Sequence, residues 1–465
     1  MSQWCLKIVA GTRSSLGHGE NCTRTRVCVC TKRGRMRTIN DRVYGEIAVS
    51  DVASRLLSNR WLVRLDQIRQ LGACSFVYPS ATHTRREHSI GVYHLSGVVA
   101  SHVRTLVPEI TEEDVELVRL AGLLHDVGHG PFSHMYETFW RDRGVAWSHE
   151  EQTLRILADE LLSVLYDARQ WTHTPEENLC FLSGLISGAV REDGAGRSVA
   201  VVRALRDVVH SPAGVDADRM DYLLRDTLCV FGSTHTVDAT RIIHSMRVVA
   251  GGRVAFDQKV ALSIQQLFEL RTRLHKQVYQ HRDVLVVETI LREEHLHHHR
   301  PCETLDAFCA LTDARILEGA PLERLHAYPR MHRVPLDFVV PTCSLCVCGH
   351  EFLVPSNFCP ACSAPERDSV PPPLDLTSGG ATEHARRTTG VPDVHVLIAD
   401  VTHGSLCDVP FHDAGRPRTL TDEGGRPARY HLRKVYCFTE APRDDADALG
   451  ARVADALRTL VAGRM

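Results

Sequence analysis

The sequence lacks any apolar run of the length, about eighteen residues, that a helix needs to cross a membrane. Residues 1–7 also lack the apolar core of a secretory signal peptide. These two absences argue against a membrane protein and against a secreted one. We therefore expect a chain that works inside the cell, in the nucleus or the cytoplasm, without a membrane partner.

An excess of charge of one sign is also missing. The 465 residues contain 54 Lys and Arg against 57 Asp and Glu, which gives a formal net charge of -3. This balance excludes a global basic field that would recruit nucleic acid or an anionic membrane, so any site for a polyanion must be local. No internal repeat is evident in the sequence.

Strand-like runs are few, and most apolar residues recur at helical spacing. With 43% hydrophobic residues, the chain can bury a large core, and we predict a mainly α fold. Strands are expected at 246–254, 394–399 and 435–438. Helices are expected at 88–107, 113–125, 149–166, 176–189, 199–209, 217–227 and 260–294.

Changes of composition divide the chain into four parts. Residues 1–36 show no periodicity and predict a flexible arm, although the basic run at 31–37 leaves open a phosphate contact or a nuclear-import segment. Residues 37–333 are expected to form the helical core. An insertion with a linker, rich in Cys, Pro and Gly, follows at 334–390, and an α/β lobe at 391–465.

The sixteen cysteines are scattered singly except for one cluster in the insertion. Its Cys-x-x-Cys spacing, with Gly and Pro suited to tight turns, predicts a zinc-ribbon-like structural site with four thiolate ligands. The ligands are expected to be four of Cys343, Cys346, Cys348, Cys359 and Cys362. Free or redox-active thiols are the alternative, and a ribbon would also offer a contact surface for single-stranded nucleic acid or a partner.

Histidine and aspartate recur in a pattern typical of a catalytic metal site. His88 lies in one predicted helix, and His125 with Asp126 closes the next one, just before a Gly-Pro break. Asp218 is the best fourth ligand, because its dense acidic segment would repel itself unless a cation were present. This donor set suits a divalent Fe, Mn, Zn or Mg ion that keeps a bound water. His83, just upstream, is expected to be a loop histidine and not a ligand.

Longer motifs around these residues resemble the HD-domain deoxynucleoside triphosphate triphosphohydrolase family, above all the vertebrate members in which this domain follows a sterile-alpha-motif domain. The motifs lie at 68–72, 85–92, 125–135, 147–150, 218–226 and 271–281. The resemblance covers 37–330 and, weakly, 391–460. We expect no sterile-alpha-motif domain in the short N-terminal segment.

The resemblance implies an HD-domain phosphohydrolase core and a regulatory-type C-terminal lobe. It also implies hydrolysis of a dNTP to deoxynucleoside and inorganic triphosphate, by metal-activated water attack on the α-phosphorus. His134 is expected to protonate the leaving 5′-oxygen, supported by His149 and Glu150, while His129 holds this network or contacts phosphate. Substrate contacts are expected from Gln70, Leu71, Arg85, Arg219, Tyr222, Asp226, Arg271, His275 and Tyr279. Arg219 stands where the family has a lysine.

The regulatory positions depart from the family pattern. The vertebrate members assemble as tetramers around activating nucleotides, and the matching residues here are Arg37, Thr38, Asn40, Arg241 and Lys259. Ser58, Val63 and Asp66 replace the residues that select a guanine activator, and Asp66 inverts a charge that would face an anion. We therefore expect a homo-oligomer, either a dimer or a tetramer. We do not expect guanine-nucleotide activation of the kind found in the vertebrate members, so any activating nucleotide would act in a different way.

Two other functions stay open at this stage. One is a catalytically weak nucleotide-sensing or nucleic-acid-binding protein on the same scaffold, and the other is a different HD activity, a phosphodiesterase or a nucleotidase. The complete set of metal ligands and candidate acids favours a dNTP triphosphohydrolase. A wall around a sugar, made by Gln70, Leu71 and Tyr279, would argue against the phosphodiesterase.

Overall fold

The structure is a computed structural model that describes residues 37–189, 194–232, 237–318, 325, 332–334, 343–345, 351–353, 378–392, 394–403, 411–413, 416–418, 430–439 and 444–462. The expected arm at 1–36 lies outside the described residues. So do four of the five clustered cysteines, namely Cys346, Cys348, Cys359 and Cys362. Within the described part of the chain, no helix is both long enough and apolar enough to span a membrane.

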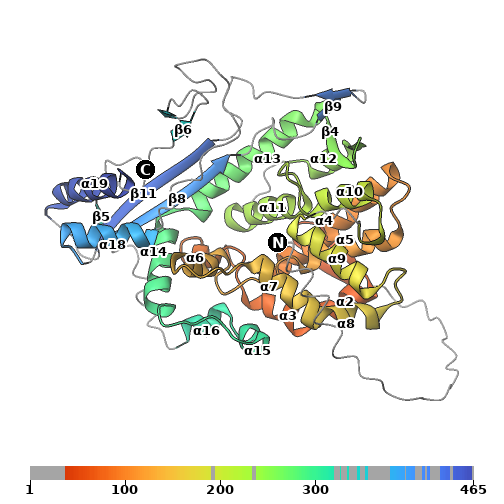
Figure 1. Ribbon diagram of the computed structural model, residues 1–465, viewed down its shortest axis with the longest axis horizontal. Helices are drawn as coiled ribbons and strands as arrows, with labels where there is room; N and C mark the ends of the chain where they lie inside the picture. Colours follow the sequence, from red (N-terminus) through yellow and green to blue (C-terminus); the bar gives the residue numbers. More distant parts are fainter. Residues whose placement is uncertain are drawn as a thin grey trace.

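Helices dominate the described residues, which confirms the predicted mainly α fold (Figure 1). The helices of the core are α2 Asp51–Leu57, α3 Arg60–Arg64, α4 Arg85–Leu106, α5 Glu112–Leu124, α6 His134–Asp142, α7 His149–Ile156, α8 Leu162–Ala168, α9 Pro175–Ser187, α10 Val199–Val209, α11 Ala217–Phe231, α12 Ala239–His244, α13 Ala261–Leu274, α14 Arg282–Ile290, α15 Leu305–Cys309 and α16 Asp313–Leu317. Short 3-10 helices and π-helical turns connect them at η2 Leu65–Gln67, η3 Gly72–Phe76, η4 Leu157–Leu161, η5 Gly194–Gly196, η6 Gln258–Val260, η7 His275–Tyr279 and η8 Leu291–His295.

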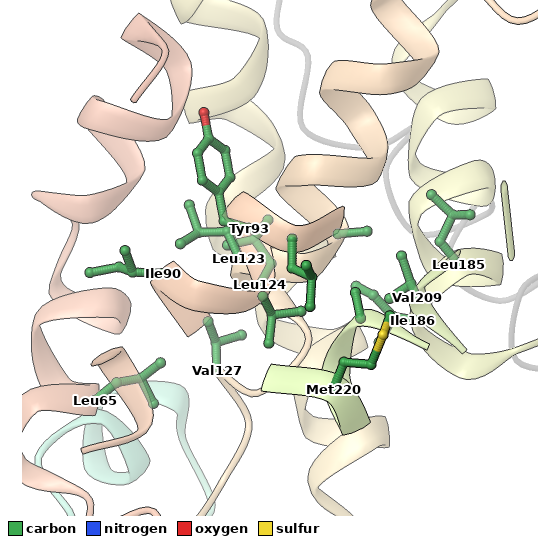
Figure 2. Close-up of a cluster of buried hydrophobic side chains, with 14 of the residues drawn as sticks. Leu65, Ile90, Tyr93, Leu123, Leu124, Val127, Leu185, Ile186, Val209 and Met220 are labelled. Atoms are coloured by element: carbon green, nitrogen blue, oxygen red, sulfur yellow. The ribbon is translucent and has the colours of Figure 1, made fainter. Parts of the chain in front are cut away.

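Helices α4 and α5 form the centre of the hydrophobic core. Figure 2 shows Ile90 and Tyr93 of α4 beside Leu123 and Leu124 of α5, and all four side chains are buried. Burying one such side chain stabilises the fold by roughly 1.5–3 kcal/mol, so this pair of helices is a rigid base for the residues at its ends. His88 lies in the first turn of α4, and the chain leaves α5 at His125.

Local sequence explains why α5 begins where it does. The Thr111 hydroxyl accepts a hydrogen bond from the Asp114 N–H at 3.1 Å, and the Asp114 carboxylate accepts one from the Thr111 N–H at 2.9 Å. This reciprocal capping box satisfies two N–H groups that the first turn of a helix leaves without partners. Thr174 and Glu177 form the same motif at the start of α9.

The strands in the described part of the chain form four small sheets. β1 Arg37–Asp41 and β2 Gly45–Val49 make an antiparallel hairpin at the start of the core. The second sheet has the order β10-β9-β4-β3, from β3 Met246–Val249, β4 Arg253–Asp257, β9 Phe411–Asp413 and β10 Arg416–Arg418. The third has the order β5-β11-β8, from β5 His332–Val334, β8 His395–His403 and β11 Tyr430–Thr439. β6 Cys343–Leu345 pairs with β7 Glu351–Leu353.

Two elements differ from the sequence prediction. The strand expected at 246–254 is a hairpin, because Gly251 and Gly252 have φ of 81° and 79° and reverse the chain between β3 and β4. The helix expected at 260–294 is interrupted. Its regular part ends at Leu274, a π-helical turn follows at η7, and α14 begins only after the extended His281.

The C-terminal lobe starts earlier in the chain than expected. Helix α18 Ser378–Thr389 lies in the segment predicted to be insertion and linker, and it packs with α19 Ala446–Ala462 and the β5-β11-β8 sheet. Figure 1 shows these elements as a small lobe beside the helical core. Glu293 of η8 approaches two lobe residues, with distances of 3.8 Å to Arg386 Nη2 and 3.5 Å to His395 Nδ1.

Of the five clustered cysteines only Cys343 is described, in β6 opposite Leu353. The structural zinc site therefore stays a prediction.

Candidate metal centre and catalytic site

The four candidate ligands come together from three helices. His88 is in the first turn of α4, His125 and Asp126 follow the end of α5, and Asp218 is in the first turn of α11. The Nε2 atoms of His88 and His125 are 3.3 Å apart. Asp218 Oδ1 lies 3.0 Å from the first of these nitrogens and 3.5 Å from the second.

Hydrogen bonds at the far side of each imidazole ring fix its direction. His88 Nδ1 is 2.8 Å from Asp221 Oδ2, and His125 Nδ1 is 2.8 Å from the Gly122 carbonyl oxygen. Both partners only accept, so each Nδ1 carries a proton and donates it. Each Nε2 is then left to face the space that the two rings share.

Asp126 completes the set of donor atoms. Its Oδ1 is 3.3 Å from His125 Nε2, and its Oδ2 is 3.6 Å from His88 Nε2. Burial disfavours the charged carboxylate, yet Arg85, at 2.6 Å, holds the pKa of Asp126 well below its ordinary value. Two ring nitrogens and two carboxylates this close need a positive charge between them, so the residues present fit a divalent metal ion.

A second cluster contains the predicted acid–base residues. The rings of His129 and His149 stack with centroids 4.0 Å apart, and the His134 ring meets His129 edge-on at 5.0 Å. His129 Nε2 lies 3.3 Å from Asp126 Oδ1, so this cluster adjoins the candidate metal centre. The His134 side chain is 71% exposed and is therefore open to a substrate. Glu150 follows His149 in the first turn of α7.

Sequence reasoning missed Glu137, whose carboxylate lies beside both His134 and His149. Its Oε2 is 3.0 Å from His149 Nδ1 and 3.7 Å from His134 Nδ1. Burial disfavours the Glu137 carboxylate, but these two histidines lower its pKa to about 2. The spacing of three residues between His134 and Glu137 on a helix is the signal that identifies such a pair.

The turn that presents His134 is strained. Phe132 and Ser133 have φ of 55° and 58°, a left-handed conformation that is uncommon outside glycine. Asp313 of α16 accepts a hydrogen bond from the Phe132 N–H at 2.7 Å. Its other oxygen accepts from the Arg69 N–H at 2.9 Å, so one distant carboxylate holds both the strained turn and the neighbouring loop.

Arginines predicted to contact phosphate are engaged with protein groups. Arg85 is buried and donates to Asp126 at 2.6 Å and to Ser133 Oγ at 2.9 Å. Arg219 pairs with the Asp216 carboxylate. Arg271 Nε lies 3.3 Å from the Tyr222 hydroxyl, so the structure brings these two predicted residues together.

Two of the residues predicted to surround a sugar are in direct contact. The Tyr279 hydroxyl donates to Asp226 Oδ2 at 2.5 Å. Gln70 is buried and Leu71 is partly buried in the core. Burial and the charge of Arg271 lower the pKa of His275, on the same π-helical turn as Tyr279, to about 3.

His83 lies outside any helix, in agreement with the loop position expected from the sequence. Its side chain is fully buried, and its Nε2 is 2.7 Å from Asp226 Oδ1. Burial lowers the pKa of His83, while its hydrogen bonds to Asp226 and Cys229 outweigh this effect and raise that pKa to about 9. Asp226 is therefore held between His83 and Tyr279.

The predicted regulatory residues fall into two groups. Arg37, Thr38 and Asn40 are on β1, where Arg37 donates to Ser54 Oγ at 3.1 Å. Arg241 donates to the Lys259 carbonyl oxygen at 3.4 Å. Asp66, which replaces a basic residue of the family, pairs with Arg86 at 2.9 Å, and Val63 is 42% exposed.

Comparisons with known proteins agree with this geometry. The HD domain family matches residues 85–225, a segment that contains all four candidate ligands and the histidine cluster. The chain is 33% identical over 257 residues to the deoxynucleoside triphosphate triphosphohydrolase SAMHD1 homolog of Dictyostelium discoideum, a match that covers 54% of this chain and 47% of that protein.

Two further relatives extend the comparison. The deoxynucleoside triphosphate triphosphohydrolase SAMHD1 of Homo sapiens is 31% identical over 278 residues, covering 56% of this chain and 44% of that protein. An HD domain-containing protein of Acanthamoeba polyphaga mimivirus is 27% identical over 297 residues, covering 59% and 62%. The chain thus spans about half the length of the SAMHD1 relatives it matches. Residues 85–225 thus match the HD domain family, and about half of the chain is similar to the SAMHD1 deoxynucleoside triphosphate triphosphohydrolases.

Proposed function

We propose that the protein is a metal-dependent dNTP triphosphohydrolase, which converts a dNTP to a deoxynucleoside and inorganic triphosphate. The observation that carries this proposal is the convergence of His88, His125, Asp126 and Asp218 next to the histidine cluster around Glu137. The names of the relatives support the substrate class.

A divalent ion held by the four ligands would supply Lewis acidity and lower the pKa of a bound water. In the reaction, a water oxygen bonds to the α-phosphorus, the bond from phosphorus to the 5′-oxygen breaks, and the triphosphate leaves with the new oxygen. The departing 5′-oxygen is basic and needs a proton. His134 is exposed and can deliver that proton. Glu137 and His149 would orient the His134 ring, and the Glu137 carboxylate would balance the positive charge of the protonated imidazole.

Substrate charge and shape are matched by the remaining residues. Arg85, Arg219 and Arg271 would neutralise the triphosphate, with Arg219 in the place of the family's lysine. Asp226 would accept the 3′-hydroxyl of the sugar, in competition with the Tyr279 hydroxyl that it binds in this structure. Regulation by an activating nucleotide and assembly into oligomers belong to the same proposal.

The direct test incubates the purified full-length chain, loaded with Mn²⁺, with each of the four dNTPs, with and without added guanine nucleotide. The products are separated by ion-exchange chromatography. We expect deoxynucleoside and inorganic triphosphate in equal amounts. Release of diphosphate or monophosphate would refute the proposed reaction, and nucleotide binding without any product would favour the nucleotide-sensing alternative.

Two variants separate the metal centre from the acid–base cluster. His125→Ala removes a ligand and should abolish both turnover and Mn²⁺ binding at the site. Glu137→Gln should lower kcat by about 10²-fold or more, since it removes the carboxylate that orients His134 and His149, while Mn²⁺ binding persists. The exposed Glu318→Gln is a matched control at the surface and should turn over as the unmodified chain does.

A further inference from the structure

A buried series of charged side chains connects the β1–β2 hairpin to the candidate ligand His88. Asp41, at the end of β1, accepts a hydrogen bond from Arg225 Nη1 at 2.7 Å. Arg225 in turn donates from Nε to Asp221 Oδ2 and from Nη2 to Asp221 Oδ1, both at 3.0 Å. Asp221 Oδ2 accepts from His88 Nδ1 at 2.8 Å, which completes the connection.

This series of charged side chains is rigid because each of them is buried. The side chains of Arg225 and Asp221 have no exposed surface, and that of Asp41 is 5% exposed. A two-pronged contact between guanidinium and carboxylate fixes the orientation of both groups. Gly91 of α4 leaves them just enough space, because a Cβ there would lie 2.0 Å from Asp221 Oδ1 and 2.2 Å from Arg225 Nη2.

At the hairpin end of this series, the position of the Asp41 carboxylate depends on the shape of the hairpin turn. Asp41 Oδ1 accepts hydrogen bonds from the Val43 N–H at 2.8 Å and the Tyr44 N–H at 3.0 Å. These bonds hold the Asp41 carboxylate only while residues 42–44 keep their turn. The other oxygen, Oδ2, is the one that receives Arg225.

We infer that Arg225 is a positioning residue for the metal centre, and that the Asp41 turn of the β1–β2 hairpin, through Arg225, sets the affinity of His88 for the ion. Arg225 holds the Asp221 carboxylate against His88 Nδ1, and this contact aims His88 Nε2 and strengthens it as a donor. If the hairpin moves, Asp41 withdraws, Arg225 loses one of its two anchors and the Asp221 carboxylate can turn. The inference rests on the metal centre of the proposed function and not on the identity of the substrate.

The hairpin offers a matched control for this inference. Arg119 of α5 contacts the other strand of the hairpin, by donating to the Ala48 carbonyl oxygen of β2 at 3.0 Å. Arg119→Gln therefore removes a contact between β2 and α5, while the turn at Asp41 and the path to His88 stay intact. Asp41→Asn has the same size as the native residue and can keep the turn through its carbonyl oxygen, but its amide group would meet the Arg225 N–H.

The test measures Mn²⁺ affinity of the full-length chain, by titration after removal of divalent metals and with free Mn²⁺ read by electron paramagnetic resonance. Mn²⁺ prefers nitrogen and oxygen donors over thiolates, so the cysteine cluster contributes little. His125→Ala gives the reference signal without the site. We expect Asp41→Asn and Arg225→Gln to raise Kd by about tenfold or more, Arg225→Lys to cause a smaller loss, and Arg119→Gln to change Kd less than about twofold.

Circular dichroism and thermal unfolding accompany each titration. Unchanged Kd in folded Asp41→Asn and Arg225→Gln overturns the inference, and so does an equal loss in Arg119→Gln. If Arg225→Gln fails to fold, Asp41→Asn decides. Weaker Mn²⁺ binding in Asp41→Asn, combined with no dNTP hydrolysis by the unmodified chain, would leave the inference standing while the proposed function falls.

Discussion

The histidines in this site have different chemical roles because their hydrogen-bond and ion-pair partners differ. His88 donates from Nδ1 to a carboxylate, so its Nε2 faces the candidate metal position. His134 and His149 share the Glu137 carboxylate, whose Oε2 lies 3.7 Å and 3.0 Å from their Nδ1 atoms and orients both rings. His83 pairs with Asp226 and serves as a buried counter-ion. The sequence alone shows four similar histidines, and only the partner of each decides its chemistry.

The buried pair of His83 and Asp226 should make stability depend on pH. The pKa of His83 rises from 6.5 to about 9 on folding, so its contribution is fully present below pH 6.5 and is lost as pH rises through about 9. One pKa unit corresponds to about 1.4 kcal/mol, so the pair contributes up to about 3 kcal/mol. We expect His83→Gln to lower the free energy of unfolding, measured in denaturant, by that amount at pH 6 and by much less at pH 9.5.

The exposed His298 provides the control for this titration. His298→Gln should leave the free energy of unfolding within about 0.5 kcal/mol at both pH values, because surface changes away from special contacts have small effects. A difference between His83→Gln and the unmodified chain that stays constant from pH 6 to pH 9.5 would show that the ion pair does not form.

Residue roles could be predicted where the residues are close in sequence or lie in a strong motif. The candidate ligands were found in this way, and Glu137 was within reach because it is one helical turn from His134. His83 was not, since its partner Asp226 is 143 residues away and nothing in the local sequence marks the pair. Asp221 and Arg225 were visible as charges, but their link to Asp41 exists only in the fold.

Elements of the core were predictable to the extent that their ends are local. Capping residues such as Thr111 and Thr174 mark helix starts by contacts within three residues. The interruption of the helix predicted at 260–294 has no such mark. A π-helical turn at η7 inserts an extra residue into the helix and directs Tyr279 to Asp226, and a hydrophobic pattern does not show where that happens.

The strained turn before α6 depends on an element far along the chain. Asp313→Ala would leave the buried Phe132 N–H and the partly buried Arg69 N–H without their acceptor. Each such loss costs about 1–3 kcal/mol, so we expect the free energy of unfolding to fall by about 2–6 kcal/mol. Turnover should fall further than stability explains, because the turn presents His134. Chemical denaturation and steady-state kinetics of the same preparation measure both quantities.

Asp306, one helix earlier on α15, is the matched control for Asp313. Its side chain is 80% exposed and pairs with Arg60 at 2.5 Å on the surface. Asp306→Ala should cost less than about 1 kcal/mol, as surface ion pairs contribute little. If Asp313→Ala were no more destabilising than Asp306→Ala, the hydrogen bonds accepted by Asp313 would not stabilise the strained turn.

At the scale of the whole molecule, the site is assembled from more than the HD domain. Residues 85–225 contain the candidate ligands and the histidine cluster, whereas Gln70, Asp226 and Tyr279 lie outside that segment. Metal binding is thus expected to be a property of the domain, whereas the proposed sugar contacts come from residues just outside the matched segment. The α/β lobe was expected from its strand patterns, but the place of α18 in it was not, since the Pro- and Gly-containing sequence before that helix indicated a linker.

Metal removal should test how far the candidate centre contributes to the stability of the whole chain. An ion that binds only the folded chain stabilises it by about 2.7 kcal/mol when present at one hundred times its Kd. We expect Tm to fall after chelation with EDTA and to recover on addition of Mn²⁺, because His88, His125, Asp126 and Asp218 then lose and regain the charge between them. His125→Ala should show little of this Mn²⁺-dependent recovery, measured by differential scanning calorimetry. An equal recovery in His125→Ala would place the stabilising ion elsewhere and would contradict the assignment of this centre.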